Sequence, residues 1–533
     1  MLLGEENKVN FSFKGLISWF LDNVVTLIFV MFVLFGFVVS EGTPIFFFLS
    51  ELCDRIFRNS FLVLSLIIPV LAGLGLNFGI VIGAMSGQAA VALARYHGMG
   101  GTSGLLFCFV VSFFFAAICG YFTGKLYNKT RGQEMIASLI VGYFANGVYQ
   151  FIFLFVVGVI IKVPATHPII KPDGVGIRMT VDLIPVEKGG LKYSLENIYK
   201  IPFVQALLIV ALAMLAILII GYWLNQKRGH GYKNHPMAFG FNALMCIAVA
   251  GIAVYVISAT PKLFATVSEL NAIASELSAT SDIDAVKSKL NTIASDLNAA
   301  ATEANDTIAP KLNAVASDIT SMIIPNLTPN KLNAVTSIIG SSASDLNDAA
   351  METSPNALVS NLIRVRTVPV ITGLLIIALC IFTELIMKTK LGQDFRSVGQ
   401  NQHISEVSGI NVDRTRVIAT MISTVLAAWG QLIFLQSMGT LSTYSAHTQI
   451  GLFSVAALLV GGASTSRASV KNAVFGTILF NAMFIMSPEM GRSLFGQAVL
   501  GEYFRTFLAY GVIGVALGLH VWKANQKNKI AVE

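Results

Sequence analysis

The stretch GLLFCFVVSFFFAAICGYF, residues 104–122, contains 19 residues and no charged side chain. A helix needs about 20 mainly apolar residues to cross the hydrocarbon core of a bilayer, so this stretch predicts a membrane-spanning helix. Its apolar residues surround the helix on every side, whereas a surface helix of a soluble protein carries one apolar stripe. The rest of the chain is therefore interpreted with a bilayer as the solvent.

The composition of the whole chain agrees with this prediction. Of its 533 residues, 55% are hydrophobic and 12% are charged, whereas a soluble globular chain carries about 25% charged residues. The net charge of +7 comes mostly from Lys and Arg in short loops beside apolar runs, as the positive-inside rule describes. The composition thus argues against a soluble enzyme, and the charge does not indicate nucleic-acid binding.

Apolar runs close to span length recur along the chain, at residues 24–40, 61–76, 78–94, 104–122, 135–161, 203–224, 237–259, 367–387, 417–436, 450–463, 472–486 and 506–522. We predict an all-α polytopic membrane protein with about 10–12 transmembrane or re-entrant helices. Gly and Asn residues favour broken or re-entrant helices within 74–87 and 455–466, because non-helical backbone at membrane depth survives only inside protein or beside water.

The basic loops predict an orientation. With twelve crossings, four basic groups fall on the cytoplasmic side, and both termini are expected there. The groups are Lys125, Lys129 and Arg131; Lys227, Arg228 and Lys233; Lys388, Lys390, Arg396, Arg414 and Arg416; and Lys523, Lys527 and Lys529. The same parity puts residues 162–202 and 260–366 outside.

Residues 262–362 differ in composition from their surroundings, being rich in Ala, Ser, Asn and Asp. They contain an internal repeat of about 20–22 residues, in which an apolar residue follows the leading Leu at +3 and, in most units, at +7. The leading residues are Leu270, Leu290, Leu312 and Leu332. This spacing predicts a small helical hairpin or bundle, and a partly disordered polar insertion is the alternative.

The change in composition divides the chain into three predicted parts. An N-terminal membrane part spans residues 1–260, and the extracytoplasmic helical repeat insertion spans residues 261–366. A C-terminal membrane part spans residues 367–533 and carries a cytoplasmic loop at residues 388–416.

No catalytic or metal-ligating motif is visible. The string nearest to a phosphate-binding loop, Gly120 to Lys125, has the wrong spacing and lacks the Ser or Thr that would hold magnesium. Neither a His-Glu-x-x-His nor a Gly-x-Ser-x-Gly pattern occurs. We expect no catalytic residue, metal or cofactor in this chain, and loop or interface roles for its seven histidines.

Ionisable residues are nearly absent from the predicted spans, although ion-coupled pumps usually need them there. Glu134, Glu384 and Asp22 lie at segment edges, where a hydrated boundary charge is expected. Uncharged polar residues inside the spans are therefore the candidates for a solute pathway, with hydrogen bonding between helices as the alternative. The candidates are Asn77, Gln88, Asn146, Gln150 and Gln431.

The segment KTKLGQDFRSVGQNQHISEVSGINVDRTR, residues 388–416, carries intermittent apolar residues at helical spacing. It predicts a short amphipathic helix across the cytoplasmic mouth. Such a helix either anchors the chain at the interface or docks in a groove of a soluble partner.

This segment resembles the cytoplasmic loop of permease subunits in binding-protein-dependent ABC importers. The branch is the one that serves simple sugars, nucleosides (the basic membrane protein type) and branched-chain amino acids. The likeness lies in TKLG at 389–392, FRSVGQN at 395–401 and SGINV at 408–412. Weaker likenesses keep the family's order: LNFG at 76–79 with Gly87 and Gln88, EMIASL at 134–139, and VAALLVGG at 455–462.

The resemblance covers about residues 61–161 and 367–522, and it implies a transmembrane permease subunit of an ATP-driven importer. Its solute would be small and polar, with a nucleoside or simple sugar favoured. The implied coupling residues are Gly392, Arg396, Gly399, Asn401 and Gly409. Ser86 and Gly142 replace an acidic residue and an Asn that the nucleoside branch has, so its substrate contacts do not carry over.

The resemblance also implies partners and a location. ATP-Mg would be hydrolysed on a separate cytoplasmic ATPase subunit, so this chain would not itself be an enzyme. A second permease, identical or related, would complete the pathway, and an extracytoplasmic substrate-binding lipoprotein would deliver the solute. The location would be the bacterial cytoplasmic (inner) membrane.

Two other classes stay open from the sequence. One is an ion-coupled secondary transporter, and the other is a membrane receptor or scaffold that uses the outer repeat domain. The sequence does not identify the solute.

Overall fold

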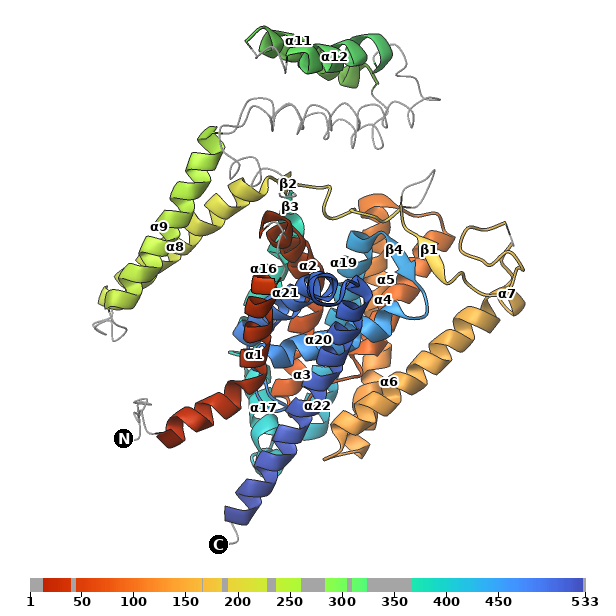
Figure 1. Cartoon of the computed structure of the whole chain (residues 1–533). Coiled ribbons are helices and arrows are strands. Elements are labelled where there is room, and N and C mark those ends of the chain that lie inside the picture. The colour runs from red at the N-terminus through yellow and green to blue at the C-terminus, as the bar shows by residue number, and fades with distance from the viewer. Residues whose placement is uncertain are drawn as a thin grey trace. The chain divides into compact units, whose positions relative to one another are not determined.

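The structure is a computed structural model that describes residues 13–39, 45–164, 166–184, 190–227, 236–259, 283–303, 309–323 and 367–530. Helices dominate these residues, and the strands are two or three residues long (Figure 1). The predicted all-α polytopic membrane fold is confirmed. The chain forms two compact units, one of Met1–Lys200 with Pro369–Glu533 and one of Ile201–Val368.

Unit 1 contains most of the helices. Its N-terminal half has α1 (Phe13–Val39), α2 (Ile45–Ser65), α3 (Ile67–Leu71), α4 (Ile80–Tyr96), α5 (Gly101–Lys129), α6 (Glu134–Phe151), the π-helical turn η1 (Ile152–Val156) and α7 (Val157–Val159). Its C-terminal half has α16 (Val370–Ile386), α17 (Lys390–Gln400), α18 (Gln402–Val407), α19 (Val412–Met438), α20 (Ala446–Val460), α21 (Val470–Phe495) and α22 (Ala498–Ile530).

Five helices of the described part are long and apolar enough to cross a membrane, and α16 with α17 would make a sixth span bent by 74°. Four apolar helices are shorter, at Val25–Val39, Ile80–Tyr96, Ala243–Tyr255 and Ala446–Val460. The sequence-based figure of about 10–12 includes short and re-entrant segments of this kind.

Helix α19 occupies the centre of unit 1, since 72% of its apolar window is buried against 28% for α5. Helices α4 and α5 each approach it through two glycines one turn apart. A Cβ at Gly87 would lie 2.7 Å from the carbonyl oxygen of Ala428, and one at Gly124 would lie 2.9 Å from the Cα of Val417. Small residues at this spacing let helix backbones approach closely inside a membrane.

The early broken helix predicted within 74–87 is present, but its position needs a correction. The apolar run at 61–76 does not form one span, because α2 extends from Ile45 to Ser65 and α3 ends at Leu71. Gly73 and Gly75 then adopt φ values of 74° and 69°, which only glycine adopts without strain. The helix resumes at Ile80 and continues through Gly87.

Two short sheets join loops at the ends of helices. Strand β1 (Thr180–Asp182) pairs antiparallel with β4 (Thr440–Ser442), with Val181 opposite Leu441. This pairing attaches the loop after α7 to the end of α19. Strand β2 (Lys200–Ile201) pairs with β3 (Val368–Pro369) where the chain leaves unit 1 and returns to it.

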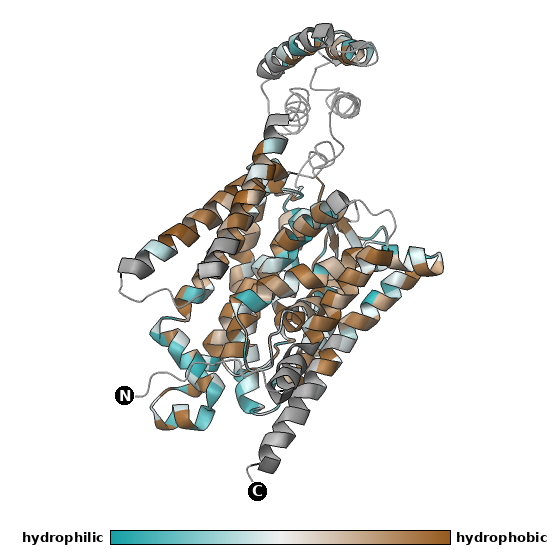
Figure 2. Cartoon of the chain, turned by 60° about the vertical axis from the view of Figure 1, so that its left-hand side comes forward, coloured by the Kyte–Doolittle hydropathy of each residue, from teal (hydrophilic) through white to brown (hydrophobic). Residues whose placement is uncertain are grey.

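Unit 2 contains α8 (Phe203–Lys227), α9 (Pro236–Ala259), α11 (Ile283–Glu303), α12 (Ala309–Asp318) and the π-helical turn η2 (Ile319–Ile323). Figure 2 shows hydrophobic residues along most of α8 and α9, and a mixture of hydrophilic and hydrophobic residues on α11 and α12.

Helices α11 and α12 pack against each other and carry two of the four repeat units. The leading residues Leu290 and Leu312 are 0% and 1% exposed, and Ile293 and Val315 at +3 are also buried. The thin apolar stripe of each unit thus forms the interior of a hairpin. The other two leading residues, Leu270 and Leu332, lie outside the described residues.

Candidate functional site

The segment resembling a permease loop forms two short helices, where a single one was expected. In α17 the side chain of Thr389 caps the N-terminus, its Oγ1 accepting a hydrogen bond from the Gly392 amide at 3.3 Å. Gly392, Phe395 and Val398 recur every three residues and form the buried face of α17. This face packs on α3 and α19, and Arg396 lies outside it and is exposed.

Glycines allow α17 to dock closely. A Cβ at Gly399 would clash with the carbonyl oxygen of Leu71 and lie 3.0 Å from the backbone nitrogen of Gly73. A Cβ at Gly392 would clash with the carbonyl oxygen of Ile386. The C-terminal end of α17 therefore rests directly on the break between α3 and α4.

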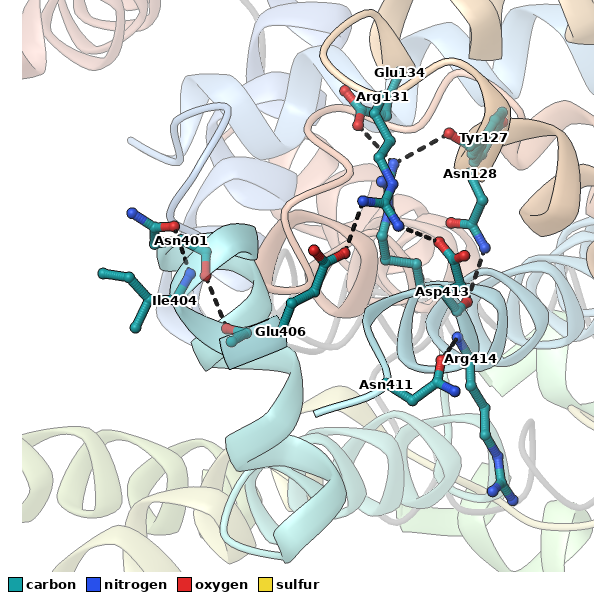
Figure 3. Close-up of polar contacts among 12 residues, drawn as sticks. Tyr127, Asn128, Arg131, Glu134, Asn401, Ile404, Glu406, Asn411, Asp413 and Arg414 are labelled. Atoms are coloured by element: carbon teal, nitrogen blue, oxygen red, sulfur yellow. Dashed lines mark hydrogen bonds and ion pairs between the residues drawn. The ribbon is translucent and has the colours of Figure 1, made fainter. Parts of the chain in front are cut away.

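Asn401 divides the segment into two helices. Its backbone is extended, with φ −156° and ψ 109°, and its Oδ1 accepts a hydrogen bond from the Ile404 amide at 3.0 Å, which caps α18 (Figure 3). Gly409 ends this region with φ +83°, and a Cβ there would meet open space. Helix α18 leaves the side chains of Ile404 and Val407 61% and 78% exposed, so it presents an apolar face without a partner in the described chain.

Arg131 ties α18 to the start of α19. It follows α5, and its guanidinium lies 2.8 Å from Glu406 and 2.7 Å from Asp413 (Figure 3). Hydrogen bonds to Asp413 and Glu406 raise the pKa of Arg131 above its usual value. Because all three side chains are well exposed, each pair stabilises the fold by only about 0–1 kcal/mol.

A second ion pair lies buried behind this cluster. Arg416 of α19 is 0% exposed, and its Nη2 donates to Glu134 of α6 at 2.6 Å and to the carbonyl oxygen of Tyr127 at 3.3 Å. The expectation of a hydrated boundary charge at Glu134 is therefore wrong. Glu134 is buried because the first turn of α6 meets Arg416, which lies 282 positions later in the chain, and the local sequence does not reveal this contact.

Three of the five candidate pathway residues meet around a histidine. His447 of α20 is 0% exposed, with Nδ1 2.9 Å from Gln88 Oε1 and Nε2 2.8 Å from Asn146 Oδ1. Gln150 Nε2 donates to Asn146 Oδ1 at 3.3 Å, and the Tyr149 hydroxyl donates to Gln88 Oε1 at 3.1 Å. The loop or interface role expected for histidines is wrong for His447, since it joins α4 and α6 inside the bundle.

The other two candidates lie apart from this network. Asn77 Oδ1 accepts hydrogen bonds from the Tyr127 hydroxyl at 2.9 Å and the Gly79 amide at 3.0 Å, so it caps the break before α4. Gln431 of α19 is 0% exposed, and neither atom of its amide has a hydrogen-bond partner among the described residues. Gln88 Nε2 is likewise unpaired there.

Metal ligation finds no support in the described ranges, where no group of three or more His, Cys, Asp or Glu side chains could hold an ion. What the geometry defines is a multi-pass helical membrane protein. At one end of unit 1, the short helix α17 docks on a break in an early helix, and the short helix α18 follows it.

Comparison with known proteins shows that the chain is similar to permease components of transporters. A family model described as a branched-chain amino acid transport system permease component matches residues 299–517. The nucleoside ABC transporter permease protein NupB of Lactococcus lactis is 31% identical over 116 residues, which are 22% of this chain and 30% of that protein. The xylose transport system permease protein XylH of Haemophilus influenzae is 34% identical over 135 residues, which are 25% and 33%.

The XylH protein of Escherichia coli is 31% identical over 159 residues, which are 30% of this chain and 37% of that protein. The chain thus spans about a third of the length of the curated relatives it matches. No solved structure matches it. These matches support the resemblance to sugar and nucleoside ABC permeases.

Proposed function

We propose that this chain is the permease subunit of an ATP-driven importer for a small polar solute, with a nucleoside or simple sugar favoured. The observation that carries the proposal is the seating of α17 on the α3–α4 break beside the exposed apolar face of α18. This element lies in the segment that resembles a permease coupling loop. The likeness to nucleoside and xylose permeases adds the solute class.

Coupling runs through α17 and α18 in this proposal. A separate cytoplasmic ATPase subunit, which binds ATP-Mg, contacts Arg396 and the apolar face of α18 formed by Ile404 and Val407. Asn401 and Gly409 hold α18 in place, and Gly392 and Gly399 seat α17. Nucleotide binding must favour one state of the permease over another, and the contact between Gly399 and Gly73 passes that preference to the start of α4.

The cluster of Arg131, Glu406 and Asp413 supplies a second route, because it joins α18 to the first turn of α19. A movement of α18 therefore reaches α4 through the glycine contact and α19 through the ion pairs. Both helices carry candidate pathway residues, Gln88 on α4 and Gln431 on α19.

The five polar residues Asn77, Gln88, Asn146, Gln150 and Gln431 remain our candidates for the solute pathway. Buried polar groups in proteins are nearly always hydrogen-bonded. The unpaired amides of Gln431 and Gln88 therefore point to a partner outside the described protein, either water or solute. Gln431→Leu removes both unpaired atoms at nearly constant volume, and a change in solute specificity or KM would support this role.

The remaining partners belong to the same proposal. A second permease, identical or related, completes the pathway, and an extracytoplasmic substrate-binding lipoprotein delivers the solute. The chain lies in the bacterial cytoplasmic (inner) membrane with both termini in the cytoplasm, and α17 and α18 then face the ATPase.

The test begins with purification of the tagged full chain from its native membrane in mild detergent, followed by mass spectrometry of the proteins that accompany it. We expect an ATPase subunit with a phosphate-binding loop and a substrate-binding lipoprotein. Uptake of labelled uridine and xylose by the same cells should stop on ATP depletion and resist an uncoupler. Uptake that survives ATP depletion and collapses with the uncoupler would replace the importer by an ion-coupled transporter, and no flux would favour a receptor.

A further inference from the structure

Unit 1 contains a cavity of about 300 Å³ that none of the candidate pathway residues lines. It lies between α2, α19, α20, α21 and α22, and Met438, the last residue of α19, is part of its wall. Helices α17 and α18 precede the opposite end of α19. With the orientation proposed above, the cavity therefore lies toward the extracytoplasmic side, where solute would be delivered.

Three arginines and no carboxylate line this cavity: Arg55, Arg58 and Arg505. Two of them have acidic partners outside the lining. Arg55 Nε lies 2.9 Å from Glu51, and Arg505 lies 3.9 Å from Glu502, a carboxylate that is 57% exposed. The wall of the cavity thus presents guanidinium groups and no carboxylate, with Arg58 as the arginine that makes no ion pair among the described residues.

Arg58 is the arginine without an acidic partner. Its Nη1 lies 3.1 Å from Met438 Sδ, a weak acceptor, and no ion pair joins it to a carboxylate within the part of the chain that the structure describes. Its Nε is buried and has no hydrogen-bond partner there, and the same is true of Arg505 Nε. Arginine presents five donors in a planar fork, so donor capacity remains available at the cavity.

Four phenylalanines also line the cavity: Phe434, Phe453, Phe480 and Phe484. The guanidinium of Arg505 lies 4.3 Å from the ring centroid of Phe484, and that of Arg58 lies 5.7 Å from the centroid of Phe434. Phe453 meets Phe484 edge to face, with centroids 5.0 Å apart. The arginines are therefore held against aromatic faces, a geometry that orients their donors.

The lining also contains the uncharged polar residues Asn59, Gln449, Ser454 and Asn481. Asn59 Nδ2 donates to Asn481 Oδ1 at 2.9 Å, and both side chains line the cavity. Small-molecule sites commonly combine apolar and aromatic walls with a few convergent polar groups and have volumes of about 300–1,000 Å³. This cavity has that composition, at the lower end of the size range.

We propose that this cavity binds the transported solute, and that the solute is a planar ring carrying hydrogen-bond acceptors and no positive charge. Phe453 and Phe480 line the cavity beside the two rings that the arginines face, and they suit a planar ring, since stacking of a base on an aromatic side chain is worth about 1–3 kcal/mol. Arginine donors suit carbonyl, ring-nitrogen or anionic acceptors at the edge of that ring. A cation would meet the charge of Arg58, which makes no ion pair among the described residues, and no carboxylate in the lining. The inference rests on the proposed function, and it narrows the solute class.

The test measures equilibrium binding to the full chain, purified with the subunits that stay bound and placed in lipid nanodiscs. The probes are uridine and adenosine as planar rings with acceptors, uridine monophosphate as an anionic form, xylose as a ring without a planar face, and 1-methylnicotinamide as a planar cation. We expect the nucleosides, with or without phosphate, to bind at least tenfold more tightly than xylose or the cation.

Variants assign the binding to this cavity. Arg58→Gln and Arg505→Gln should each weaken nucleoside binding at least tenfold, and Arg58→Lys should recover only part of it because lysine lacks the planar fork. Phe484→Leu should weaken it as well. The matched controls are Arg492→Gln and Phe475→Leu, whose side chains are exposed and do not line the cavity, and they should bind normally. Unfolding temperature and elution volume check that each variant is folded.

Three outcomes overturn the inference. The first is nucleoside binding that is unchanged in folded Arg58→Gln and Arg505→Gln. The second is no binding of either nucleoside, and the third is equally tight binding of xylose. If ATP-dependent uptake persists in such a case, the proposed function stands and only the assignment of this cavity falls. If uptake does not depend on ATP, the proposed function itself falls.

Discussion

Single residues decide how α18 and the start of α19 are held in unit 1. Arg416 and Glu134 are 282 positions apart in the sequence and meet in the interior, whereas Arg131 makes its ion pairs at the surface. The two arrangements differ strongly in what the loss of one partner should cost.

Glu134→Gln should destabilise the protein strongly, because it leaves the buried Arg416 charge unpaired. Breaking a buried pair by removing one partner costs about 3–5 kcal/mol. Arg131→Gln breaks exposed pairs and should cost about 1 kcal/mol or less. Thermal unfolding in detergent, followed by circular dichroism, would compare the two. Equal losses of stability would contradict the buried pairing, and Glu134→Gln with Arg416→Met should regain part of the loss.

Gly399→Leu should reduce ATP-dependent uptake to background while the protein stays in the membrane, because the side chain would push α17 away from Leu71 and Gly73. Gly409 lies in open space, so Gly409→Val acts through its positive φ, and a left-handed backbone costs a non-glycine residue about 1–2 kcal/mol. It should also impair uptake. The measurement is uptake of labelled solute, corrected for the amount of protein in the membrane.

Gly147→Ala is the matched control, since a Cβ at this position of α6 meets nothing within 4 Å and alanine favours a helix. It should transport normally. Normal uptake by Gly399→Leu would remove α17 from the coupling route.

At the scale of elements, the sequence predicts the apolar helices and the presence of an early break, because both follow from local composition, but it places the break within 74–87 where the helix already resumes at Ile80. The sequence does not predict features that depend on contacts between segments far apart in the chain. The apolar run at 61–76 gives no sign that α2 ends at Ser65. Arg55 and Arg58 precede this run in the sequence, and they line the cavity because α2 packs beside α19.

Hydrophobic spacing also predicts one amphipathic helix in 388–416, but Asn401 divides this segment into the two helices α17 and α18. Its extended backbone and its cap on Ile404 are a feature that a search for spacing overlooks. His447 escaped notice for a similar reason, since its partners Gln88 and Asn146 lie on α4 and α6.

The cap on α18 gives a prediction at this scale. Asn401→Ala should loosen α18 by about 0.5–2 kcal/mol, because the Ile404 amide loses its acceptor, and Asn401→Asp should retain the cap. Hydrogen exchange of the α18 amides would rise in the Ala variant alone. A similar exchange rate in both variants would contradict a role for the side chain as a cap.

At the scale of the whole molecule, the chain divides into a unit that carries α17, α18 and the arginine-lined cavity and a unit that carries the repeat hairpin. The boundaries at 1–260, 261–366 and 367–533 remain a prediction, because changes in composition mark the insertion but do not show which helices pack together. We also hypothesise that the insertion is a cap that touches the external binding protein or the envelope, because the predicted orientation places its repeats on the outer side.

Independence of the two units can be tested in the hairpin. Leu290→Ala removes a fully buried side chain between α11 and α12, and such changes cost about 2–5 kcal/mol. Hydrogen exchange should rise over 283–323 and stay unchanged over 412–438. Increased exchange in both regions would show that the units fold together. Uptake by the same variant reports whether an intact hairpin is needed for transport.

The glycine pairs of α4 and α5 have a consequence for movement. Backbone contact leaves little room for sliding, and packed interfaces switch between discrete arrangements instead of deforming smoothly. We therefore expect helices α4, α5 and α19 to move as one rigid body. Helices α2, α20, α21 and α22 line the arginine-lined cavity together with α19, so a displacement of that body relative to them would change the volume of the chamber where solute would sit.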